Sequence, residues 1–127
     1  MMTEAMIIWD REFNIDIVYD VYSGEEILPY QKTALESFLG NYKSLIDSSL
    51  KDVKNYCLEN NEKEIGQKVI DNIFKYVIPK AIFIKRTKQE KQIVSLLCDY
   101  KFNPDDGLAI VFENNQMIEI GTQNIIL

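Results

Sequence analysis

The sequence predicts an α+β fold, because helical and strand-like periodicities occupy separate parts of the chain. Apolar and polar residues alternate over 15–22, apolar residues recur at three- and four-residue steps through the middle, and a period of two returns after Lys80. We therefore expect an N-terminal β-hairpin, three consecutive helices and a C-terminal antiparallel four-stranded meander, with the helices packed on one face of the sheet. A length of 127 residues fits a single domain, 1–127.

The N-terminal hairpin is predicted from two apolar segments and the polar connection between them. AMIIW (5–9) and IDIVYDVY (15–22) read as strands, and DREFN separates them. The hairpin could join either edge of the meander or pack separately, so the strand order stays open.

Three helices are predicted in the middle of the chain. The first, 29–39, opens with a proline, which suits a first helical turn, and ends at Gly40. The second follows a regular apolar stripe over 42–57. The third covers a wider apolar arc over 65–77 and is stopped by Pro79.

Four strands are predicted after the helices. They are AIFIK (81–85), QIVSLLCDYKF (92–102), LAIVF (108–112) and MIEI (117–120). An edge at 117–127 could pair with a second copy of the chain, so a homodimer through this strand is one expected partnership.

Composition and hydropathy are those of a globular protein. Hydrophobic residues make up 46% and charged residues 27% of the sequence. The apolar runs are far shorter than the roughly 20 residues of a membrane span, and the N-terminus lacks the features of a secretory signal. We expect a soluble, cytoplasmic protein without a membrane partner, in which Cys57 and Cys98 are small buried hydrophobes.

The charge is unevenly distributed. The net charge is -6, and the segment 80–91 alone carries +4, which leaves -10 for the rest. An acidic body repels phosphate backbones, so we expect no nucleic-acid partner. It attracts a basic protein partner; the alternative is that the acidity only maintains solubility.

The segment CDYKFNPDDGLAIVFENNQ, 98–116, contains the most suggestive group of oxygen ligands. The candidate ligands are Asp99, Asn103, Asp105, Asp106 and Glu113. No register fits an EF-hand, because Gly107 at its sixth position puts Pro104 and Phe102 where ligands are needed. We interpret the segment as a turn in which Asn103 bonds its own backbone and Gly107 takes a positive φ, with weak cation binding as the alternative.

The sequence contains no recognisable catalytic or cofactor site. It has no histidine, so Ser–His–Asp and Cys–His arrangements are impossible, and the glycine-rich phosphate-binding motifs do not occur. Adjacent carboxylates are more often solvated surface groups than general acids. We expect no metal and no cofactor, and the sequence disfavours an enzyme.

A partner surface is expected near the N-terminus, where aromatic side chains and carboxylates occur together. Tryptophan and tyrosine favour interfaces, and the carboxylates would face a basic partner. The candidate residues are Trp9, Asp16, Asp20, Tyr22, Glu25, Glu26 and Tyr30.

Two long segments carry a family resemblance. With IDIVYDVYSGEEILPYQKTALESFL (15–39) and LLCDYKFNPDDGLAIVFENNQMIEIGTQNIIL (96–127), the sequence resembles a family of small acidic bacterial proteins described only as a domain of unknown function. The resemblance implies a bacterial cytosolic protein and, loosely, an association with toxins and their immunity proteins. It supplies no catalytic residue.

Two functions are compatible with these observations. The first is a non-catalytic binding protein, such as an immunity-type protein that masks a basic partner with its acidic surface. The second is a small-molecule sensor or a carboxylate-based enzyme that uses the groove between helices and sheet, which requires an acid with a raised pKa in a concave site.

Overall fold

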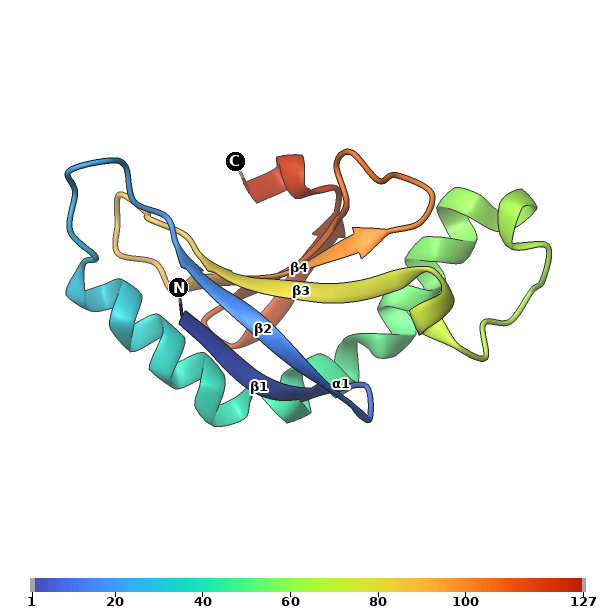
Figure 1. Ribbon diagram of the computed structural model, residues 1–127, viewed down its shortest axis with the longest axis horizontal. Helices are drawn as coiled ribbons and strands as arrows, with labels where there is room; N and C mark the ends of the chain where they lie inside the picture. The colour runs from blue at the N-terminus through green and yellow to red at the C-terminus, as the bar shows by residue number, and fades with distance from the viewer. Residues whose placement is uncertain (1, 127) are drawn as a thin grey trace.

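The computed structural model describes residues 2–126 and combines one long helix with one six-stranded sheet (Figure 1). The elements are β1 (Met2–Ile8), β2 (Arg11–Tyr19), α1 (Pro29–Ile65), the 3-10 helix η1 (Ile73–Lys75), β3 (Val77–Ile84), β4 (Ile93–Tyr100), β5 (Leu108–Glu113), β6 (Gln116–Gly121) and the 3-10 helix η2 (Gln123–Ile126). The strands lie side by side in chain order. The α+β class is confirmed.

The sheet is six-stranded and mixed, which corrects the prediction of an N-terminal hairpin and a C-terminal antiparallel four-stranded meander. β1 and β2 form a hairpin across a two-residue turn in which Trp9 and Asp10 both have positive φ, 50° and 68°. β2 then pairs in parallel with β3, through residues 16–19 and 81–84. The remaining neighbours are antiparallel, so the hairpin extends the meander into a single sheet.

One helix replaces the first two predicted helices. α1 runs through Gly40, because buried residues continue on the same face before and after it, with Leu35 and Phe38 followed by Ile46. A glycine inside a helix costs about 1 kcal/mol relative to alanine. Each of these buried apolar side chains contributes more than that, about 1.5–3 kcal/mol, so the helix does not end at the glycine.

The third predicted helix, 65–77, is also wrong. α1 ends at Ile65, where Gly66 takes a left-handed conformation (φ 71°) and donates its N–H to the Glu62 carbonyl over 2.9 Å. The chain then continues as an irregular segment and the short η1. Pro79 does not stop a helix; it lies within β3, beside a bulge and before the residues that pair with β2.

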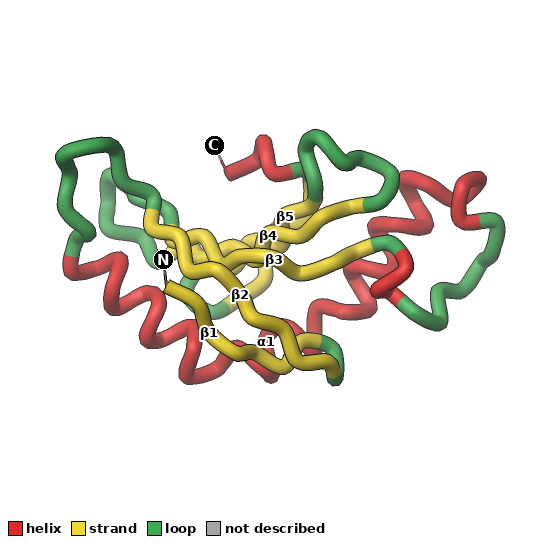
Figure 2. The backbone as a smooth tube through the Cα atoms, in the orientation of Figure 1, coloured by secondary structure: helices red, strands yellow, loops and turns green. Residues whose placement is uncertain are grey.

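The two faces of the sheet are covered differently. α1 packs on one face, over a large core that includes Met6, Ile15, Ile82, Leu96 and Phe112. The other face holds a small cluster around Val111, to which η2 contributes Ile126. Figure 2 shows α1 and η2 on opposite sides of the sheet.

A buried glutamine fixes the start of α1 against the sheet. Gln31 is fully buried, and its Nε2 donates to the carbonyls of Asp20 and Ile84 at 3.2 and 3.3 Å, which lie beyond the end of β2 and at the end of β3. Its Oε1 accepts the Leu28 N–H at 3.0 Å. One side chain therefore joins the helix to both strands of the parallel pair.

Replacement of this glutamine should be costly. Gln31→Leu leaves the partly buried Asp20 carbonyl and Leu28 N–H without this partner, while the Ile84 carbonyl keeps the Asp20 N–H at 2.9 Å. We expect a loss of about 2 kcal/mol in the free energy of unfolding. Urea denaturation followed by circular dichroism measures it. The exposed Gln67→Leu is the control, with a change within about 0.5 kcal/mol. A loss below about 1 kcal/mol for Gln31→Leu would show that the bridge is unimportant.

Gly40 should be replaceable with a gain in stability. It is exposed, has an ordinary helical conformation, and an added Cβ meets no atom within 4 Å. We expect Gly40→Ala to stabilise the protein by about 1 kcal/mol. Gly66→Ala, at a positive φ, should destabilise it by about 1 kcal/mol in the same thermal-denaturation measurement. The same sign for both variants would contradict this assignment.

The two cysteines should be inert in the native protein. Cys57 on α1 and Cys98 on β4 are both fully buried and free, and burial raises the pKa of both thiols. We expect Ellman's reagent to label neither thiol of the folded protein rapidly and both thiols after unfolding in guanidinium. Rapid native labelling of either one would contradict the buried assignment.

Candidate functional site

Trp9 does not share a surface with the other predicted site residues. Its side chain is only 6% exposed, and its Nε1 donates to the Ile46 carbonyl at 3.0 Å. It lies in the turn before β2, whereas Asp20 lies just after β2. A strand of that length separates them by roughly 30 Å.

Residues 20–28, here called the acidic loop, are in contact with residues 85–92, here called the basic loop. Asp20 Oδ2 accepts the Arg86 N–H at 3.0 Å, and the Arg86 guanidinium lies 3.5 Å from Glu25 Oε2. Arg86 also donates to the Glu26 carbonyl at 3.3 Å. The two loops lie side by side at the same end of the sheet (Figure 1).

Both predicted tyrosines belong to this corner. Tyr30 accepts the Thr87 N–H and donates to the Thr87 carbonyl, at 2.6 and 2.9 Å. Tyr22 is exposed, and its backbone N–H donates to Glu25 Oε1 at 2.8 Å. The corner thus has an internal structural role, which accounts for the clustering of aromatic and acidic residues there.

Asp16 is separate from both groups. It is half-buried on β2, and it pairs with Thr3 on one side and with Ala81 on the other. Of the seven predicted residues, the structure gathers Asp20, Tyr22, Glu25, Glu26 and Tyr30 around the basic loop. Trp9 and Asp16 lie elsewhere.

The segment suspected of binding a cation forms the predicted turn. Asn103 Oδ1 accepts the Asp106 N–H at 3.2 Å, and Gly107 has a φ of 58°. A Cβ on Gly107 would lie 2.7 Å from the Cys98 carbonyl, so the position requires glycine. Asp99 points to Lys80 instead, at 3.7 Å. Within residues 2–126, no group of three or more acidic or cysteine side chains is placed to hold a metal ion.

A groove between α1 and β6 collects carboxylates that the sequence analysis did not single out. We call it the acidic groove; its volume is about 300 Å³. Its lining residues are Asp52, Asn55, Tyr56, Glu59, Met117, Ile118, Glu119 and Ile120. Ile118 is 52% exposed, and the register of β6 shifts at this residue, which is the extra one of a β-bulge.

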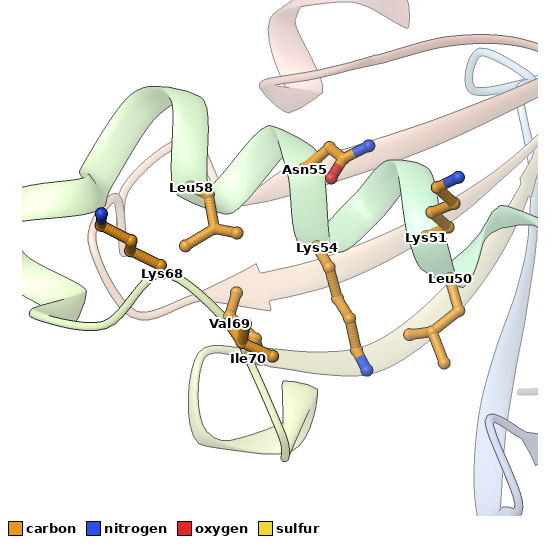
Figure 3. A pocket seen from close by; sticks show the side chains of 8 residues that line it. All are labelled: Leu50, Lys51, Lys54, Asn55, Leu58, Lys68, Val69 and Ile70. Atoms are coloured by element: carbon orange, nitrogen blue, oxygen red, sulfur yellow. The ribbon is translucent and has the colours of Figure 1, made fainter.

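A second hollow lies on the other flank of α1, where the segment after Gly66 passes the helix (Figure 3). We call it the lysine cleft; its volume is about 390 Å³. Its lining residues are Leu50, Lys51, Lys54, Asn55, Leu58, Lys68, Val69 and Ile70. In Figure 3, Leu50, Lys54 and Leu58 project from α1 on the side of Val69 and Ile70.

The groups whose pKa is shifted by burial are phenols and thiols. Burial raises the pKa of Tyr56, which lines the acidic groove. Burial also raises the pKa of Tyr100, whose hydroxyl donates to Asn61 Oδ1 at 2.6 Å. Asn61 has non-helical backbone angles and lies at a kink before the last turn of α1. The hydrogen bond from Tyr100 therefore ties this kink to β4.

The flanks of α1 could in part have been found from the sequence. Asp52, Tyr56 and Glu59 recur at four- and three-residue steps, as do Lys51, Lys54 and Leu58, so each set shares one flank of a helix. Nothing in the local pattern indicates that β6 borders one flank and residues 68–70 the other. The grooves therefore became apparent only from the tertiary structure.

Comparisons with known proteins identify a family but no activity. None of the helices in the described part of the chain combines the length and hydrophobicity of a membrane span. No curated protein is significantly similar to the chain. No solved structure is significantly similar to it either. The family described as "Domain of unknown function (DUF6985)" matches residues 3–127, and the chain therefore belongs to this family.

Proposed function

We propose that this protein is a non-catalytic binding protein that recognises a basic segment of a partner protein in the acidic groove. The proposal keeps the expected basic partner but moves its site. The acidic loop is less suitable, because Asp20 and Glu25 already contact Arg86.

The proposal rests on unpaired carboxylates that surround the apolar residues of the acidic groove. Asp52, Glu59 and Glu119 make no ion pair within residues 2–126. They surround Met117, Ile118 and Ile120, of which Ile118 is more than half exposed. Lysine and arginine side chains fit such a groove, since their aliphatic stems can cover the apolar floor while the charged ends meet the carboxylates.

The bulge in β6 favours docking through side chains. β6 is an edge strand, but the extra residue at Ile118 and the charge of Glu119 both hinder the regular pairing of another strand. The same features hinder self-pairing of two chains along this edge. We therefore expect a partner to insert basic side chains into the groove. A basic protein masked by an immunity-type protein would bind in this way.

The enzymatic alternative has less support. It requires a concave site that holds an acid with a raised pKa. The groups whose pKa burial raises are instead Tyr19, Tyr56, Tyr100 and the two cysteines, and the chain has no histidine to act as a general base.

Affinity capture with charge variants tests the proposal. Tagged wild-type protein, incubated with source-organism lysate, should retain a basic protein at ~50 mM salt and release it at ~300 mM, because salt screens the charges. The variant Asp52→Asn/Glu59→Gln/Glu119→Gln should not retain it.

The control variant, Glu4→Gln/Glu12→Gln/Asp105→Asn, loses the same number of charges at exposed positions outside the groove. It should behave as the wild type. Equal capture by both variants, or no capture of a basic protein at either salt concentration, would refute the proposed function.

A further inference from the structure

We infer that the lysine cleft binds a single-chain anionic amphiphile, with the acid group near Lys54 and the alkyl chain over Ile70, Val69 and Leu58. This site lies on the opposite flank of α1 from the acidic groove and would serve a different ligand. The inference does not depend on the protein partner.

The first argument is the environment of Lys54. Its neighbours four residues away on α1 are Leu50 and Leu58, so the helix provides no carboxylate at the positions where a partner usually lies. Lys54 is half-buried, and its side chain extends along the apolar side of the cleft (Figure 3). Within residues 2–126, Lys51, Lys54 and Lys68 make no ion pair. A lysine whose aliphatic stem is half-buried and whose ammonium group has no counter-ion favours an anion.

The second argument is the apolar surface that these lysines border. Val69 is 66% exposed, although the next residue, Ile70, is buried in the core. With Leu50 and Leu58, the two residues form an apolar wall and floor in a hollow of about 390 Å³, within the range of small-molecule sites. An alkyl chain would cover Val69 and displace water from this surface.

The charge of the surroundings limits where the anion can bind. Glu59 and Glu62 line an adjoining hollow together with Lys68, though neither forms an ion pair with it. The negative charges of these two glutamates repel an anion on the far side of Lys68. In Figure 3 the side chain of Lys68 points away from that of Lys54, with Leu58 and Val69 between them. The head group is therefore placed at Lys54, at the end of the cleft away from these glutamates.

NMR titration of the 127-residue protein with decanoate, below its micelle concentration and at low salt, tests the inference. We expect saturable shifts confined to residues near 50–58 and 68–70. Binding of octanoate should be weaker by up to about fourfold for each methylene removed. Decylammonium, with the same chain and the opposite charge, should bind at least tenfold more weakly than decanoate.

Charge variants locate the head group. Lys54→Gln/Lys68→Gln should weaken decanoate binding at least fivefold. Lys32→Gln/Lys88→Gln removes the same charge from two exposed lysines outside the cleft and should leave it unchanged. The amide spectra of both variants report whether they are folded.

Several outcomes would overturn the inference. They are equal affinity for decanoate and decylammonium, shifts elsewhere in the molecule, unchanged affinity in Lys54→Gln/Lys68→Gln, and no saturable decanoate binding. Binding to vesicles that contain phosphatidylglycerol, without binding of decanoate, would also overturn it and would identify a membrane surface as the ligand.

Discussion

The parallel pairing of β2 with β3 is the constraint on which the rest of the fold depends. Only residues 16–19 and 81–84 join the N-terminal hairpin to the other four strands. Parallel neighbours need a long crossover, and α1 is that crossover. Because Gln31 bonds to both Asp20 and Ile84, the crossover is fixed at the point where the two strands end. The helix can then cover the core face of the whole sheet.

The same corner brings part of the uneven charge together. The segment 80–91 carries +4 in a chain of net charge -6, and part of this charge faces the acidic loop that follows β2. Arg86 bonds to the acidic loop through Glu25 and the Glu26 carbonyl, while its backbone meets Asp20. Opposite charges here hold together two loops that are distant in sequence. Surface ion pairs contribute only up to about 1 kcal/mol each, so the backbone hydrogen bonds and buried Gln31 carry most of the stabilisation.

The local pattern of apolar and polar residues predicted the positions of the strands well and those of the helices poorly. A period of two and turn residues such as Asn114 and Asn115, both with positive φ, place the C-terminal strands within a few residues. The predicted helix end at Gly40 was wrong because the apolar stripe of the helix continues in phase across this residue. The spacing over 65–77 suits a helix, yet Ile70 and Ile73 are buried by an irregular segment and η1, while Val69 stays exposed. The β2–β3 pairing joins residues far apart in sequence, so no local pattern predicts it. For the same reason, no local pattern predicts which segments border the flanks of α1.

The two grooves lie on opposite flanks of the same turns of α1, and Asn55 lines both. Lys51 and Asp52 are adjacent, and Lys54 and Glu59 lie little more than one turn apart, so the charges of the two sites are separated by about one Debye length, roughly 10 Å at 0.1 M salt. An anion bound near Lys54 would cancel positive potential that now opposes a basic segment beside Asp52 and Glu59. Each occupant would therefore strengthen binding of the other, since such coupling is reciprocal. Salt should reduce this coupling together with the affinity for the basic segment, because both arise from the same partly exposed charges.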